Sequence, residues 1–481
     1  MKHWLTIPTA VSLLVWMFAC PAAVHAQDPE TEAPPKPAAK AYPPIGPGDD
    51  EETDQGPIAL QPDDRPLTGF QDWTVGTPSE KHSYWIPGIS YTNFIESNAL
   101  AQGGGNSWNS TSYILGNLSL LQNWGTAQLS LNYSGGEAIS TDSAIGTGQT
   151  HQLSAFQTSN WGRWRVTVLD QFAYLRQAQF GFGAGSGIAI PGVGGLLAPS
   201  LPGLQTGLTP SQSAFTQVGP ETSNSFGTQF NYALTPRSSL TIGGVFSILR
   251  FTEPGSIESN DVVLYAGYNH QLSRTDTLGM TYRFTAYEFL DSPQAIGVHV
   301  IQAAYGKKIT GRLALRLSGG PEITSFRVPP GVGTGTQFID GSGSASLSYA
   351  FSAGSVSLSY NHGANNGSGL LFGATSDQVI GSANRKLTRA WRGNVSLGYT
   401  RNASLAGSST NTNPNLTYNT VYIGAGLERS FNRATDLTLN YTANIQTSNT
   451  AVCAGANCGT DFTSHVITIG LKWRSRPFVL H

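Results

Sequence analysis

Strict alternation of apolar and polar residues is the feature that most constrains the fold of this chain. In the stretch ATDLTLNYTANIQTSN, residues 434–449, Leu437, Leu439, Tyr441, Ala443 and Ile445 fall on one face and Thr, Asn and Gln on the other. A two-residue period is that of a β-strand, in which neighbouring side chains point to opposite faces. The same period recurs in TAQLSLNY, SLTIGGVFSI, ASLSYAF, NVSLGY and VYIGAGL. From residue 81 onward the pattern predicts an all-β chain with at most minor helices.

The connections between these strands alternate in length. Eight short turns are expected at LQNWGT, SNWGRW, LTPRSS, LSRTD, KKITGR, FSAGS, LTRAW and FNRAT, each joining two alternating runs as a hairpin. Longer segments rich in Gly, Ser, Asn and Thr lie between the hairpins. Eight turns and nine loops connect eighteen strands, with sixteen as the alternative, running from near Ser83 to near Trp473. Both ends of such an array lie on the short-turn side.

The first 80 residues have a different composition. Residues 1–26 have a short basic start at Lys2 and His3, an apolar centre and a small-residue end in AVHA, which is the pattern of a secretory signal peptide. A membrane anchor and a lipoprotein signal at Cys20 are the rival interpretations. Residues 27–80 carry 12 acidic and three basic residues and many prolines, a composition that cannot bury a core and predicts a disordered tether. We therefore expect three parts: 1–26, 27–80 and a β domain over 81–481.

The alternation alone does not separate a membrane barrel from a stack of soluble sandwich domains. Only 12% of the residues are charged, and the polar faces lack the Lys and Glu that solubilise an outer surface. Aromatic residues repeatedly end the apolar rows at the turn side, as at a membrane interface; they are Trp124, Trp161, Trp164, Phe351, Trp391, Phe431 and Trp473. These features favour a transmembrane antiparallel up-and-down barrel whose apolar face contacts lipid.

The pattern as a whole resembles the Gram-negative outer-membrane β-barrel proteins, and in particular porins, over about 400 residues. The last strand, HVITIGLKW, ends on Trp473 and looks like the signal that the family presents to its assembly machinery, although eight further residues follow it and Phe478 is the other candidate. The resemblance implies an outer-membrane location, contact with membrane lipid and lipopolysaccharide, and passive diffusion of small hydrophilic solutes or glycans. An occluded barrel serving an envelope complex such as exopolysaccharide export, with the tether binding a periplasmic partner, is the alternative.

Candidate functional residues are those of opposite parity to the apolar face. They are expected to line the lumen and are Arg163, Arg165, Arg283, Arg312, Arg316, Lys472, Glu322 and Glu428. If several lie at one height they form a selective cationic strip; the alternative is that they are paired or solvated. Asp170 is in phase with the apolar face and requires a bulge or an outside contact. The apolar loop at about 177–222 is expected to narrow the lumen or, alternatively, to cap it.

Other chemistry is not indicated. Cys453 and Cys458 are expected to form a small disulfide, because two thiols without further ligands cannot complete a zinc site. No nucleophile elbow, His-Glu-x-x-His or phosphate-binding loop occurs in a suitable context. The sequence therefore predicts no enzyme activity, no metal, no cofactor and, at a pI near 6.5, no nucleic-acid partner.

Overall fold

A computed structural model describes residues 83–97, 108–142, 146–175, 220–252, 257–290, 295–327, 337–367, 371–405, 416–432, 434–449 and 461–480. The expected signal peptide, tether, apolar loop at about 177–219 and disulfide between Cys453 and Cys458 lie outside these residues. None of the described residues form a helix of the length and apolarity that would cross a membrane.

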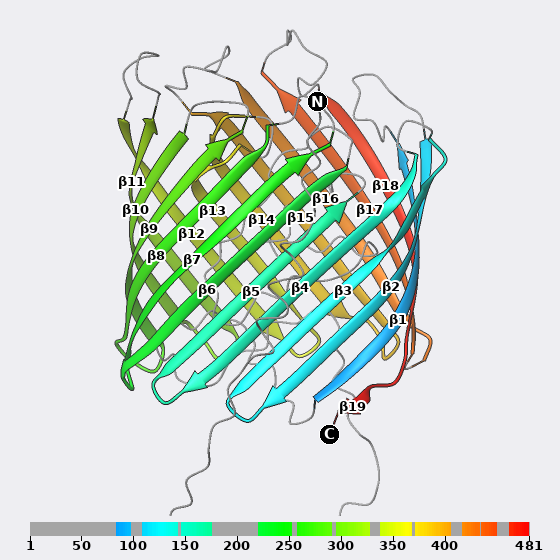
Figure 1. Cartoon of the computed structure of the whole chain (residues 1–481), viewed down its shortest axis with the longest axis horizontal. Helices are drawn as coiled ribbons and strands as arrows, with labels where there is room; N and C mark the ends of the chain where they lie inside the picture. The colour runs from blue at the N-terminus through cyan, green and yellow to red at the C-terminus, as the bar shows by residue number, and fades with distance from the viewer. Residues whose placement is uncertain are drawn as a thin grey trace, which may run out of the picture. The chain divides into compact units, whose positions relative to one another are not determined.

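The described residues form one antiparallel sheet that closes into a barrel (Figure 1). Each strand pairs with its sequence neighbours, and β1 closes the barrel by pairing with both β2 and β18. The strands are β1 (Ser83–Ser97), β2 (Trp108–Trp124), β3 (Ala127–Ser140), β4 (Thr147–Trp161), β5 (Trp164–Leu175), β6 (Glu221–Thr235), β7 (Ser238–Phe251), β8 (Ser259–Gln271), β9 (Asp276–Phe289), β10 (Ala295–Lys308), β11 (Leu313–Arg327), β12 (Gln337–Phe351), β13 (Gly354–Asn365), β14 (Ala374–Lys386), β15 (Trp391–Ser404), β16 (Thr417–Ser430), β17 (Thr435–Ser448), β18 (Phe462–Arg474) and β19 (Phe478–Leu480).

β19 extends the wall rather than adding a nineteenth position. It pairs with the start of β1, where Trp85 lies opposite Phe478, while β18 pairs with the rest of β1. The expected eighteen-strand antiparallel barrel is therefore confirmed, with its first strand at Ser83 and its last full strand ending at Arg474. All eight predicted hairpin turns are present, at the lower rim in Figure 1. We call this rim the turn end and the opposite rim the loop end.

The outer wall is apolar, as the alternation predicted. In β17, Leu439 and Tyr441 are 45% and 43% exposed, whereas the intervening Asn440 is 6% exposed. Large apolar side chains with solvent-exposed surface recur on the outward positions of neighbouring strands, such as Ile423, Leu397 and Leu358. The inner face carries mainly Ser, Thr, Asn and Gln, interrupted by buried apolar clusters such as that of Leu169, Val245 and Val263. This inside-out arrangement is the one that a barrel needs when its exterior meets hydrocarbon and its interior meets water.

Aromatic side chains mark the turn-end edge of the apolar wall. Trp124 and Trp161 are the last residues of β2 and β4, and Trp164 and Trp391 are the first residues of β5 and β15. The guanidinium of Arg429 lies 5.3 Å from the Trp391 ring and 4.9 Å from the Phe431 ring. Amphipathic rings and cations are the residues favoured at a membrane interface.

Tyrosine hydroxyl groups mark the other edge. The seventh residues of β3, β9 and β17 are Tyr133, Tyr282 and Tyr441, and each hydroxyl is hydrogen-bonded to a histidine on the next strand, at 2.8–3.0 Å. In all three pairs the histidine lies one outward position nearer the loop end than the residue opposite the tyrosine. Tyr360, the seventh residue of β13, binds Asp377 in the same way at 2.9 Å. Polar groups therefore enter the outer wall at one level.

Asp170 belongs to this level. It is the seventh residue of β5 and faces outward, and its Oδ1 accepts a hydrogen bond of 2.8 Å from Nδ2 of Asn224 on β6. The pairing of β5 with β4 and β6 runs without a register shift over the described residues. Of the two conditions expected for Asp170, a bulge is therefore absent and a partner on the outer wall is present. The carboxylate occupies a tyrosine position at the edge of the apolar band.

Candidate functional site

The lumen is the candidate functional site, and its inner wall is polar over most of the barrel. On β6, β7 and β8 the inward side chains form a hydrogen-bonded network in which Thr241 donates to Asn231 at 2.7 Å and Gln229 donates to Asn231 at 3.1 Å. The hydroxyl of Tyr265 donates to Gln229. These side chains are buried, with Gln229 1%, Thr241 0% and Tyr265 3% exposed, and their hydroxyl and amide groups satisfy one another's hydrogen bonds.

The segment that follows β13 folds into the barrel. Asn366 donates through Nδ2 to Oδ2 of Asp261 at 3.0 Å and to Oγ of Ser259 at 3.4 Å, both on β8. Because β9 to β12 separate β8 from β13 in the sheet, this contact crosses the interior. The backbone N–H of Ala364 also donates to Glu322 of β11 at 3.0 Å. We call residues 364–373 the inner strap; its residues 368–370 lie outside the described part of the chain.

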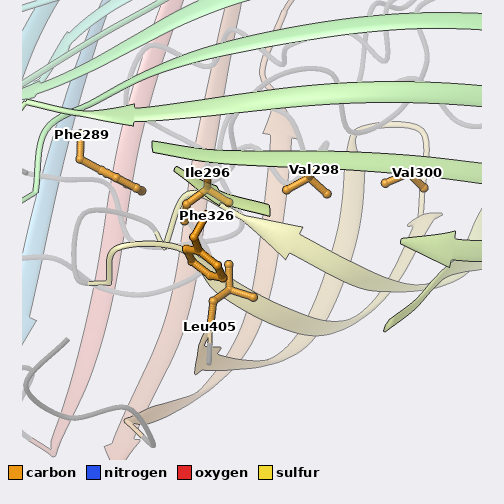
Figure 2. Packing of buried hydrophobic residues seen from close by; sticks show 6 residues of the cluster. All are labelled: Phe289, Ile296, Val298, Val300, Phe326 and Leu405. Atoms are coloured by element: carbon orange, nitrogen blue, oxygen red, sulfur yellow. The ribbon is translucent and has the colours of Figure 1, made fainter. Parts of the chain in front are cut away.

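Apolar packing holds the inner strap against β9 to β11. Phe372 meets Phe289 edge-to-face, with ring centroids 5.4 Å apart. Behind this contact lies a buried cluster of inward-facing residues near the loop end, shown in Figure 2: Phe289, Ile296, Val298, Val300, Phe326 and Leu405. Leu405 directly follows β15 and lies next to Phe326 in Figure 2. The cluster packs inside the barrel and so reduces the open cross-section near the loop end.

Gly373 permits this packing. Its φ is +81°, and a Cβ atom at this position would lie 2.5 Å from Cδ1 of Ile296 and 2.9 Å from Cδ1 of Leu405. A left-handed backbone and the absence of a side chain are therefore both required where the inner strap returns to β14.

A charged row crosses the wall at mid-height, level with Val300 of the apolar cluster. Arg283 of β9 and Glu322 of β11 both lie opposite Val300 of β10, so they flank it on the inner face. Glu322 is 1% exposed and lies opposite the exposed Asp340 of β12.

A second charged group lies at the turn end of β14 to β18. Arg392 and Glu428 approach to 3.9 Å, and Arg474 and Asp436 to 4.0 Å. Lys386 lies opposite Arg392, and Lys472 lies opposite Asp436. These inward side chains form a continuous band on five neighbouring strands.

Six of the eight residues expected in the lumen occupy inward strand positions: Arg165, Arg283, Arg316, Lys472, Glu322 and Glu428. Arg283 and Glu322 lie in the charged row at mid-height, and Lys472 and Glu428 lie in the charged group at the turn end, so the six do not form a single strip. Arg163 and Arg312 lie in the exposed turns before β5 and β11 and not on the inner wall. Strand alternation ends at a turn, so parity no longer fixes the direction of their side chains.

The residues that sequence reasoning missed are those of the inner strap. The expectation for the lumen concerned the loop at about 177–222, of which only 220–222 are described, whereas the described residues of the inner strap, 364–367 and 371–373, are those placed inside. Its sequence, ANNGSGLLFG, contains one signal: three consecutive apolar residues, Leu370 to Phe372, within a Gly- and Asn-rich loop.

The sheet is closed and has an apolar exterior and a largely polar interior. This is the fold of a transmembrane β-barrel. No protein-family model and no curated protein sequence matches the chain. Solved structures that resemble it include the outer-membrane protein OpdK of Pseudomonas aeruginosa, at 9% identity and a TM-score of 0.42 over 81% of this chain and 99% of that one. A BenF-like porin from Pseudomonas fluorescens Pf-5 gives 8% and 0.42, over 82% and 99%. OccAB4 of Acinetobacter baumannii gives 10% and 0.40, over 82% and 99%. Likenesses this distant assign no role to any residue of the lumen.

Proposed function

We propose that the chain is an outer-membrane channel through which small hydrophilic solutes or glycans diffuse passively. The observation that carries the proposal is the closed eighteen-strand wall with an apolar outside and a polar inside. A barrel of about this size is too wide for the side chains of its own wall to fill. Solutes would therefore cross along the polar inner wall, past the inner strap, the charged row at mid-height and the charged group at the turn end.

The outer wall supports the membrane placement. On β15, nine residues run from Trp391 at the turn-end edge to Tyr399, whose hydroxyl donates to Asn419 at 3.1 Å. About 9–11 residues are needed for a tilted strand to cross the hydrocarbon core. Beyond Tyr399 the next outward residue is Arg401. Short turns face the periplasm in bacterial barrels, so the tether and the last strand would lie on the periplasmic side, available to a periplasmic partner and to the assembly machinery.

The alternative function is an occluded barrel that anchors an envelope complex such as exopolysaccharide export. The specific observation in its favour is the inner strap, which packs with Leu405 and Phe289 inside the lumen. An occluded barrel has the same outer wall, so only permeation distinguishes the two.

Single-channel recording in planar bilayers tests the proposal. The full-length mature chain, refolded in detergent and verified by a heat-dependent gel shift, is expected to give discrete conductance steps. Liposome swelling with uncharged sugars of increasing size then gives the size limit. Folded, inserted protein without steps would contradict the channel and favour the occluded barrel.

A further inference from the structure

The inward-facing charges of the barrel are separated by sign along its axis. Odd-numbered strands begin at the turn end and even-numbered strands begin at the loop end, so the position of a residue within its strand gives its height. Outward charges such as Arg385, Arg401 and Arg429 share the parity of the exposed apolar residues and are not part of the lumen.

The loop half of the described inner wall is acidic. It holds five carboxyl groups against one guanidinium, that of Arg283. The five are Glu96 near the end of β1, Glu221 at the start of β6, Asp261 near the start of β8, Glu322 in the far half of β11 and Asp340 in the first half of β12.

The turn half is basic. Within the described strands it holds seven basic side chains against the carboxyl groups of Glu428 and Asp436. The seven are Arg165, Lys308, Arg316, Lys386, Arg392, Lys472 and Arg474.

Local hydrogen bonds and ion pairs do not remove this asymmetry. In the turn half, Glu428 and Asp436 lie beside Arg392 and Arg474, and bases remain in excess. In the loop half, groups that donate hydrogen bonds face the carboxylates: Ser464 donates to Glu96 at 2.8 Å, and Asn366 donates to Asp261. Asp340 is exposed on the inner wall. Glu221, Asp261 and Glu322 are themselves buried, at 5%, 3% and 1% exposure.

We propose that the lumen is electrically bipolar along its axis and that ionic current through it is therefore direction-dependent. The proposal rests on the channel function above, since it requires an open lumen. The acidic loop half concentrates mobile cations and the basic turn half concentrates mobile anions, because a wall of fixed charge attracts its counter-ions.

The order of the two halves fixes the sign of the effect. When the loop side is positive, the field drives cations from the acidic half and anions from the basic half towards the middle of the pore. Both carriers accumulate there and the conductance rises. With the loop side negative, both are drawn out of the middle and the conductance falls. Current is thus larger with the loop side positive.

Salt provides an internal test. The screening length is about 10 Å at 0.1 M and about 3 Å at 1 M. Fixed charges therefore influence most of the lumen at low salt and only a layer at the wall at high salt. The current ratio at opposite voltages is expected to reach about twofold at 0.1 M and to approach one at 1 M.

The experiment is a set of current–voltage curves from single insertions of the full mature chain. Orientation is fixed with a biotin on a C-terminal tag, at the turn end, and streptavidin in one chamber. Neutralising the basic half with Lys386→Gln and Lys472→Gln is expected to reduce the ratio and shift the reversal potential in a salt gradient towards cation selectivity. Asp340→Asn is expected to reduce the ratio and shift selectivity towards anions.

Arg385→Gln is the matched control, because Arg385 is adjacent to Lys386 and faces outward; it is expected to leave both measurements unchanged. Conductance steps with a current ratio of one at 0.1 M, with the opposite sign, or unaffected by the inner variants would overturn the bipolar lumen and leave the channel standing. Folded barrels without any steps would overturn the channel itself and the bipolar lumen with it.

Discussion

The side-chain amide of Asn366 and the carboxylate of Asp261 form a hydrogen bond across the interior of the barrel, with Nδ2 3.0 Å from Oδ2. The two residues are 105 positions apart in the sequence, and both are buried, at 6% and 3% exposure. This bond ties the inner strap to β8, on the far side of β9 to β12.

Loss of this bond is expected to release the inner strap. A hydrogen bond to a charged group contributes about 1.5–3 kcal/mol, so Asn366→Ala is expected to raise the mean single-channel conductance and to add rapid fluctuations. Asp261→Ala is expected to act in the same way, and the double variant should add little to either. Asn361→Ala, an exposed inward residue of β13, is the control. A conductance unchanged by both single variants would show that the strap does not limit the current.

Gly373 offers an independent test of the same segment. Gly373→Val places a branched side chain where φ is +81° and where an added Cβ atom would lie only 2.5 Å from Cδ1 of Ile296. The inner strap cannot then keep its packing, and conductance is expected to rise while the heat-dependent gel shift of the barrel persists. Gly311→Val is the matched control, since Gly311 lies in a turn with nothing within 4 Å of an added Cβ. Equal effects of the two substitutions would contradict the constriction.

The sequence allowed the wall to be predicted because the information is local. Alternation within residues 434–449 assigns the two faces of one strand. A tight turn such as FSAGS shows that the strands before and after it are neighbours in the sheet. The interior could not be predicted in this way. Asn366 reaches its partner only after β8 to β13 have assumed their places, and nothing near residue 366 encodes that distance. Arg163 shows the limit of parity itself, because alternation has no meaning within a turn.

Asp170 illustrates a further kind of information, the register between strands. From the sequence it is a charge on an apolar face. In the barrel it is level with Tyr133 and Tyr441, the seventh residues of their strands, and its partner Asn224 is on β6. Only the pairing of β5 with β6 brings the two together. The sequence therefore indicates that Asp170 needs a compensating contact, but not which residue provides it.

Removal of the partner of Asp170 is expected to destabilise the barrel. Asn224→Leu leaves a carboxylate unpaired at the edge of the apolar band, at a cost of about 1–3 kcal/mol. The double variant Asp170→Leu with Asn224→Leu is expected to recover at least the stability of the unmodified chain, because both side chains then match the outer wall. Urea unfolding in lipid vesicles measures this. Thr228→Leu, also outward on β6, is the control. A double variant less stable than Asn224→Leu would place this pair outside the lipid-facing band.

The closing seam predicts which aromatic residue at the C-terminus matters most for barrel formation. Trp473 lies opposite Ile89. Residues 475–477 then interrupt the strand. After them, Phe478 pairs with Trp85 and stacks on its ring, with the ring centroids 4.9 Å apart. Because β19 continues the edge at which β1 and β18 meet, removal of residues 475–481 leaves the first residues of β1 without a partner on that side. Unpaired strand edges are costly in a membrane.

We therefore expect Phe478→Ala to lower the yield of heat-modifiable, membrane-inserted protein and deletion of 475–481 to lower it further. Trp473→Ala should have a smaller effect on closure, since the backbone pairing of β18 with β1 remains, and serves as the comparison. Pulse-chase labelling with gel-shift detection in cells follows the folded fraction directly. If the deletion assembles at the normal rate while Trp473→Ala does not, the last strand ends functionally at Trp473 and β19 is dispensable.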